Sequence, residues 1–101
     1  MAKKIKTVTL DFTGCKTYRD LHYCLRDTLN FPDYYGCNLS ALSDSLRRDS
    51  IYGSNGFVSI RGVHTMPKDL REYSKDVFEI FDYNKIHQQQ FGNVFGYEIL
   101  D

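Results

Sequence analysis

The feature that most constrains the fold is the alternation of strand-like and helix-like patterns along the chain. Residues 6–12, 57–63 and 93–100 are short runs rich in β-branched and aromatic side chains, which is typical of strands. Longer segments with helical periodicity separate these runs. This order predicts an α/β fold, βαβαβ, with a small three-stranded parallel sheet and helices packed on it.

Apolar residues at helical spacing predict three helices, which begin near Thr17, Asn38 and Pro67. Thr and Asn cap helices through their side chains, and Pro suits the first helical turn. We expect residues 52–56 to form a flexible turn and residues 84–92 to form a loop or a frayed helical end. The side chains expected to face the core are Tyr18, Leu21, Leu25, Leu29, Leu39, Leu42, Leu46, Leu70, Tyr73, Val77, Ile80 and Phe81.

The length and composition favour one domain over residues 1–101. Thirteen basic and thirteen acidic residues cancel, which argues against general nucleic-acid binding. We expect neither a signal peptide nor a membrane-spanning run, because no apolar segment follows the basic start of the chain. Three cysteines, an odd number, suit a reducing cytoplasm better than a disulfide framework. The sequence therefore predicts a cytoplasmic protein.

The chain carries no strong signal for catalysis or for a cofactor. Cys15, Cys24 and Cys37 lack the spacing of metal-binding cysteines, and no glycine-rich phosphate loop follows any predicted strand. Cys37 with His22 or His64 is a candidate nucleophile and base, but no third orienting group is identifiable. We therefore expect no metal, no cofactor and no enzymatic activity. A small hydrolase that uses Cys37 is the alternative, and loss of activity in Cys37→Ala would reveal it.

The most informative segment is the window from residue 27 to residue 46. It contains no Lys or Arg, and its only charges are Asp27, Asp33 and Asp44. Basic residues flank the window on both sides, and two adjacent tyrosines lie within it. A local anionic patch with exposed tyrosines indicates a surface that binds a positively charged partner.

The same window carries the motifs of a known family. Residues 34–46 resemble the signature of barstar, the bacterial ribonuclease inhibitor, through Tyr34-Tyr35-Gly36, Asn38-Leu39, Ala41-Leu42, Asp44 and Leu46. The preceding segment resembles the first helix and the following turn of that family through Asp20-Leu21-His22, Leu25, Leu29 and Pro32. The resemblance in motifs covers residues 17–46. Beyond them it consists of the order of the predicted elements.

The resemblance implies a barstar-like fold, in agreement with the three-stranded parallel sheet that the strand pattern predicts. It also implies an inhibitor of a secreted bacterial ribonuclease, either a barnase-like guanyl-specific enzyme or a related toxin. Such an inhibitor binds the active-site cleft of the nuclease through an acidic helix and the Tyr-rich loop before it. The expected partner is that protein, with no nucleic acid and no membrane, and the inhibitor is expected to be a monomer before the complex forms. The alternative is a repurposed immunity or interaction module with a different, non-ribonuclease partner.

The resemblance also implies roles for individual residues. Asp44 matches the aspartate that mimics a phosphate in the nuclease cleft, and Tyr34 matches a tyrosine that packs against the nuclease. Gly36 and Asn38 match positions that shape and contact the edge of the cleft. For these two residues, turn geometry and helix capping are explanations of equal weight. Gly36 in particular is expected to adopt a backbone conformation that other residues resist.

Several positions of the expected binding face depart from the family pattern. Ser40 and Ser43 stand where the family has an acidic residue and a tryptophan. Arg47 and Arg48 closely follow the late aspartate, where they could neutralise it or repel a basic cleft, and Glu79 on the third predicted helix could compensate for the lost charge. The predicted partner-binding residues are Tyr34, Gly36, Asn38, Ser40, Ser43, Asp44, Arg47 and Glu79.

Overall fold

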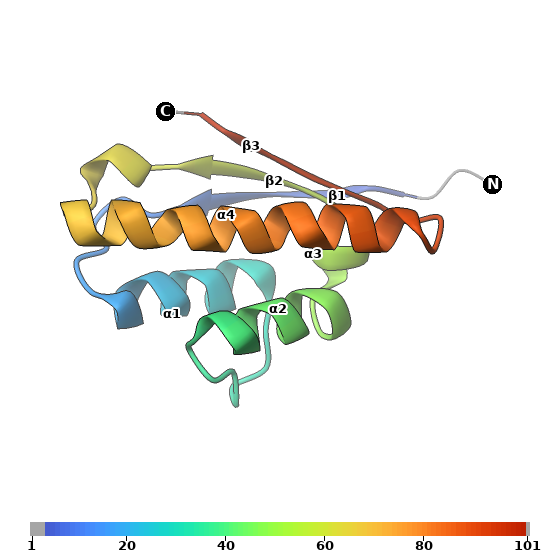
Figure 1. Cartoon of the computed structure of the whole chain (residues 1–101), viewed down its shortest axis with the longest axis horizontal. Helices are drawn as coiled ribbons and strands as arrows, with labels where there is room; N and C mark the ends of the chain where they lie inside the picture. The colour runs from blue at the N-terminus through green and yellow to red at the C-terminus, as the bar shows by residue number, and fades with distance from the viewer. Residues whose placement is uncertain (1–3, 101) are drawn as a thin grey trace.

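A single parallel sheet organises the structure, a computed structural model that describes residues 4–100. Its strands are β1 (Lys6–Asp11), β2 (Asn55–Arg61) and β3 (Val94–Ile99), and β2 lies in the middle. Both neighbouring pairs are parallel, with Leu10 opposite Ile60 in the first pair. The predicted α/β fold with a small three-stranded parallel sheet is therefore confirmed (Figure 1).

Helices occupy the connections between the strands. The chain runs from β1 through α1 (Tyr18–Leu29), α2 (Leu39–Arg48) and the short α3 (Ile51–Ser54) into β2. A 3₁₀ turn, η1 (Val63–Thr65), and the long α4 (Lys68–Gln89) then lead to β3. Helix α1 packs on β1 and α4 packs on β3, whereas α2 packs on α4 and α3. In Figure 1, α2 accordingly lies farther from the strands than α4 does.

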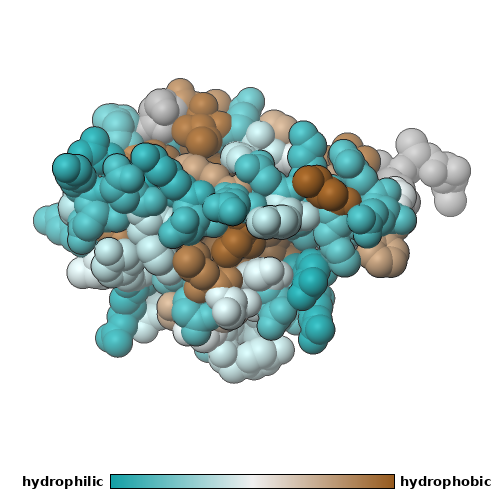
Figure 2. Space-filling model, viewed as in Figure 1, coloured by the Kyte–Doolittle hydropathy of each residue, from teal (hydrophilic) through white to brown (hydrophobic). Residues whose placement is uncertain are grey.

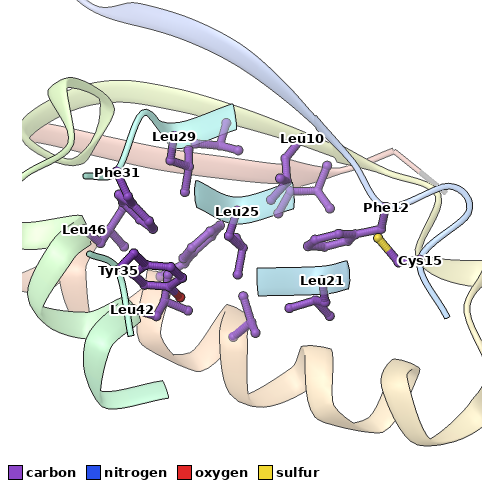
Figure 3. Packing of buried hydrophobic residues seen from close by; sticks show 14 of the residues in the cluster. Leu10, Phe12, Cys15, Leu21, Leu25, Leu29, Phe31, Tyr35, Leu42 and Leu46 are labelled. Carbon is purple, nitrogen blue, oxygen red and sulfur yellow. The ribbon is translucent and has the colours of Figure 1, made fainter. Parts of the chain in front are cut away.

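The core lies between the sheet and the helices. Alternate residues of the strands point into it, including Leu10, Val58 and Phe95, which are buried. Figure 3 shows how the leucines of α1 pack against Phe12, at the end of β1, and against the α2 side chains. The predicted core residues that are fully buried are Leu21, Leu25, Leu29, Leu42, Leu46, Leu70, Val77 and Phe81.

The side chain of Tyr18 does not face the core, which corrects the prediction. It is 47% exposed, and its ring contacts the ring of Tyr73 edge-on, with centroids 4.7 Å apart. Tyr18 is the first residue of α1, and its ring lies at the surface beside Tyr73 of α4. Leu39, Tyr73 and Ile80 are only partly buried, so they line the border of the core and not its centre.

The segment predicted as a flexible turn, residues 52–56, is ordered structure. Residues 51–54 form α3, which is capped by the Ser50 hydroxyl, and β2 begins directly at Asn55. Gly53 makes this junction possible, because a Cβ placed there would lie 1.8 Å from the carbonyl oxygen of Leu46 in α2. Only a glycine therefore allows the end of α2 to approach α3 this closely.

The predicted loop or frayed end at residues 84–92 is also wrong over most of its length, because α4 continues to Gln89. Asn84 and Gln88 are buried polar residues. The amide of Asn84 donates to the carbonyl oxygen of Gly53 at 2.9 Å, and the amide of Gln88 donates to the Asn84 side chain at 3.3 Å. The Asn93 amide donates in turn to Gln88 at 2.9 Å. The polar residues at these positions form hydrogen bonds with each other and with the backbone inside the protein, so they do not indicate a loop.

The surface on the side of α4 is mostly hydrophilic, with small separate apolar patches (Figure 2). None of the helices in residues 4–100 combines the length and the apolar composition needed to cross a membrane.

We expect Gly53→Ala to lower the free energy of unfolding by about 2 to 3 kcal/mol, because the added methyl group overlaps a backbone carbonyl and not a movable side chain. Urea denaturation measures the change. Ser54→Ala, at the next residue of α3, is the matched control and should change the stability little. A change below about 0.5 kcal/mol in Gly53→Ala would contradict this account of the junction.

Candidate functional site

The loop between α1 and α2 separates two adjacent tyrosines into different environments. Helix α1 ends at Asn30, which adopts the left-handed conformation with φ 62°. The N–H of Tyr35 then donates to the carbonyl oxygen of Pro32 at 3.0 Å and closes a turn. This turn buries the ring of Tyr35 against Phe31, with centroids 4.9 Å apart, and leaves Tyr34 79% exposed. Tyr35 is thus the buried member of the pair and Tyr34 the exposed one.

The buried side chain of His22 bonds to this loop from the side of the core. The Nδ1 atom of His22 lies 2.7 Å from the hydroxyl oxygen of Tyr35, and its Nε2 atom lies 2.7 Å from the hydroxyl oxygen of Tyr73. His22 belongs to α1 and Tyr73 to α4, so one imidazole connects both helices to the loop. Burial lowers the pKa of His22 and raises the pKa of Tyr35, which favours the neutral forms of both.

His22 is therefore a structural residue, and the sequence contained a signal for it. It precedes Leu25 and Leu29 by three and seven residues, the spacing of a single helix face. Both of its ring nitrogens are occupied by tyrosine hydroxyls, so it is not free to act as a base for Cys37. The Cys37 thiol instead points toward the carbonyl oxygen of Tyr35 at 3.7 Å. This geometry does not support a Cys37–His22 pair of nucleophile and base.

The other two thiols are equally unsuited to nucleophilic chemistry. Burial and the neighbouring Cys24 raise the pKa of Cys15 to about 11, and burial also raises the pKa of Cys24. Both thiols are therefore protonated at neutral pH, and the thiolate is the reactive form. Within the described part of the chain, no group of three or more His, Cys, Asp or Glu side chains could hold a metal ion.

Asn38 and Gly36 are both used in building the start of α2. The Asn38 side-chain oxygen accepts the N–H of Ala41 at 2.8 Å, which confirms it as the N-cap. Its amide donates to the carbonyl oxygen of Gly36 at 3.3 Å. The residue before the cap that adopts the left-handed conformation is Cys37, with φ 52°, and not Gly36 as expected. Gly36 instead lies close to the start of α2, where a Cβ would lie 3.2 Å from the Cβ of Ala41, a tight contact that a small shift would relieve.

Helix α2 buries Leu42 and Leu46 and turns its other side to solvent, as predicted. Ser40, Asp44 and Arg48 are exposed, one helical turn apart from each other. This face therefore displays the one carboxylate of the helix, whose side chain is 63% exposed.

Two surface hollows border the exposed face of α2. The first, of about 310 Å³, lies between α2 and the loop, and we call it the loop hollow. It brings together three predicted site residues, Tyr34, Gly36 and Asp44, with Arg48 and Asp49. Sequence reasoning missed Asp49, because it follows the last helical residue and so has no place in the helical spacing of α2. The loop hollow thus has two carboxylates and an exposed aromatic ring on its walls.

The second hollow, of about 270 Å³, lies between α2 and α4, and we call it the helix hollow. It is lined by two predicted site residues, Ser43 and Arg47, and by Tyr83, Asn84 and His87 of α4. The α4 residues were not predicted, since the sequence does not show which part of a long helix lies beside α2.

The remaining predicted site residues lie outside both hollows. Ser40 is exposed near the start of α2, and Asn38 is the N-cap. Glu79 is exposed on α4, one turn before Tyr83, and is not among the residues that line the helix hollow. The structure therefore brings three of the eight predicted residues to the loop hollow and two to the helix hollow, and the other three line neither.

The family model of barstar, the barnase inhibitor, matches residues 5–99 of the 101-residue chain. The matched range begins just before β1 and ends with the last residue of β3, so it contains the whole sheet, every helix named above and the loop with Tyr34. No curated protein matches the chain. The match therefore covers the fold as a whole and not only the motif at residues 34–46.

We expect the stability of the protein to fall as the pH falls below about 6.5, because the pKa of His22 is lower in the folded state than in the unfolded chain. The unfolded state then binds more protons, so the contribution of neutral His22 is present above pH 6.5 and is lost toward the folded pKa. The slope attributable to one group is at most about 1.4 kcal/mol per pH unit. Urea denaturation of wild type and His22→Gln between neutral and mildly acidic pH measures it. Equal slopes in the two proteins would contradict the assignment.

Proposed function

Because the chain belongs to the barstar family, we propose that it inhibits a bacterial ribonuclease, either a barnase-like guanyl-specific enzyme or a related toxin. The proposed inhibitory surface is the exposed face of α2 together with the loop before it. The observation that carries the proposal is the loop hollow, in which the exposed Tyr34 and the exposed carboxylate of Asp44 stand on the same surface. No enzymatic activity belongs to this proposal, since an inhibitor acts by occupying its partner.

The electrostatic reason is the chemistry of the partner. A ribonuclease must hold a phosphodiester, so its cleft collects Arg, Lys and His side chains. A carboxylate placed in that cleft mimics the phosphate and accepts charge-assisted hydrogen bonds. The Asp44 side chain is 63% exposed on a helix, and Asp49 adds a second carboxylate to the same hollow. Together they offer a cationic side chain of the nuclease two acceptors.

Tyr34 is the proposed aromatic anchor. Its side chain is the most exposed of the large apolar or aromatic residues, whereas the neighbouring Tyr35 is fixed inside by Phe31 and His22. A rigid support keeps the ring of Tyr34 in place before the partner arrives, which reduces the entropy that binding costs. Aromatic residues with this combination of exposure and support often carry much of the energy of an interface.

The other predicted residues take supporting roles in the proposal. Gly36 and Asn38 keep the loop in the shape that opens the loop hollow. Ser40, Ser43 and Glu79 would form the polar rim around the charged centre. In the cell, we propose that the protein is cytoplasmic and monomeric until it meets the nuclease, and that it protects the producing cell before the nuclease is secreted.

One observation favours a second candidate function. Arg47 bonds to Asp44, and Ser40 and Ser43 replace larger or charged family residues on the same face. These features fit a barstar-fold immunity or interaction module whose partner is not a ribonuclease. The adjacent reading frame distinguishes the two candidates: a secreted ribonuclease or polymorphic toxin there favours inhibition, and the absence of one favours the module.

We expect Asp44→Ala to weaken the complex with a catalytically inactive barnase by about 2 to 5 kcal/mol, because it removes the group that pairs with the basic cleft. Calorimetric titration measures the affinity. Thermal unfolding should hardly change, since the residue is exposed. Asp76→Ala, which removes an exposed carboxylate of α4 outside both hollows, is the matched control. Equal affinities of wild type and Asp44→Ala would remove Asp44 from the interface.

We also expect the association rate to fall as the salt concentration rises, because an anionic surface attracts a basic partner over a distance that salt shortens. Between about 0.01 and 1 M ionic strength, the Debye length falls from roughly 30 to 3 Å, which sets the useful range for stopped-flow measurements. Association rates that do not depend on salt would show that Arg47 and Arg48 cancel the field of the carboxylates.

A further inference from the structure

The carboxylate at the centre of the proposed surface already has a cationic partner within the protein. The guanidinium Nη2 atom of Arg47 donates to Oδ1 of Asp44 at 3.0 Å, across three residues of α2. Arg47 is the one basic side chain among residues 4–100 that is paired with Asp44. A cation that approaches Asp44 from outside therefore meets an occupied acceptor and a like charge beside it.

Resting on the function proposed above, we propose that Arg47 determines partner specificity by occupying the place on Asp44 that a guanidinium group of the partner would take. The loop hollow is then a guanidinium site with a built-in competitor. A basic partner binds when its cationic side chain displaces Arg47 from Asp44. A partner with a weakly basic cleft cannot do so and does not bind. The residue sets the threshold of binding without contributing an attractive contact of its own.

The geometry of the two hollows gives Arg47 a place to move. Asp44 lines the loop hollow, whereas Arg47 lines the helix hollow, so the ion pair bridges the ridge between them. Ser43 is small enough to leave the helix hollow open, and the exposed ring of Tyr83 forms another part of its wall. A displaced guanidinium can lie against such a ring, which attracts cations through its face.

The Arg47–Asp44 ion pair is weak enough for a cation of the partner to displace Arg47. Both side chains are substantially exposed, 36% for Arg47 and 63% for Asp44. Exposed pairs of this kind correspond to a factor of roughly 1.5 to 5 in an equilibrium constant. The repulsion between Arg47 and an incoming cation increases this factor, because like charges placed together at an interface are costly.

Arg48 provides the matched comparison within the same helix. It carries the same charge, follows Arg47 directly and lines the loop hollow together with Asp44, but the structure records no ion pair between them. If only the net charge of the surface mattered, removing either arginine would have the same effect. If direct competition matters, Arg47→Gln must have the larger effect.

The first experiment uses the protein without a protein partner. Methylguanidinium, the charged end of an arginine side chain, is titrated into ¹⁵N- and ¹³C-labelled wild type, Arg47→Gln and Arg48→Gln, and the NMR shifts of the Asp44 carboxylate and of the loop amides are followed. We expect Arg47→Gln to bind the probe about fivefold more tightly than the other two proteins. Equal responses of the two variants, or no gain in Arg47→Gln, would overturn the proposal.

A second experiment separates this proposal from the proposed function. Calorimetric titration with catalytically inactive barnase should give an affinity for Arg47→Gln about fivefold or more above that of Arg48→Gln, and the gain should vanish when Asp44→Ala is combined with Arg47→Gln. Asp44-dependent binding without this gain would leave the inhibitor function intact and reject the role of Arg47. Absence of binding in every variant would count against inhibition of barnase, and the methylguanidinium titration would still decide the role of Arg47.

Discussion

The arrangement of the candidate site depends on two short hydrogen bonds of one buried imidazole. His22 reaches Tyr35 in the loop through one ring nitrogen and Tyr73 on α4 through the other, each at 2.7 Å. Because a buried polar group is costly unless it is paired, all three side chains are restricted to this arrangement. The loop cannot shift without breaking the bond between Tyr35 and His22 of α1, and His22 is itself held by Tyr73 of α4. The exposed position of Tyr34 is therefore a consequence of how its neighbour is held.

Further contacts fix the position of α2 in the same way. The Asn38 side chain determines where the helix begins, Gly53 lets α3 lie against Leu46 of α2, and Asn84 of α4 donates to Gly53 of α3. The Ser50 hydroxyl donates to the carbonyl oxygen of Leu29 and so ties the end of α2 to the end of α1. Helix α2 makes few contacts with the sheet itself, so these connections take the place of direct packing on the strands. A helix that is anchored in the core on one side and exposed on the other is a suitable platform for binding a protein surface.

The sequence was sufficient for features that depend on periodicity and short motifs. The three strands, the caps at Thr17 and Asn38 and the exposed side of α2 with Asp44 follow from local spacing. The sequence was insufficient where the hydrogen-bond partner of a residue lies far away in the chain. Asn84 and Gln88 looked like loop residues because their partners are known only from the fold. The ion pair of Asp44 is different, since Arg47 was recognised as a neighbour but the geometry alone distinguishes it from Arg48.

The surface around Asp44 carries charges of both signs, which act on a basic partner in opposite ways. Two carboxylates and an exposed tyrosine favour a basic cleft, while the arginines beside them oppose it. The central claim is that this surface blocks a ribonuclease active site, and the most direct measurement is the rate of RNA cleavage by a guanyl-specific bacterial ribonuclease as the protein is added. The account predicts that the rate falls toward zero as the two proteins reach equal concentration. A cleavage rate that stays unchanged at a large excess of the protein would contradict it.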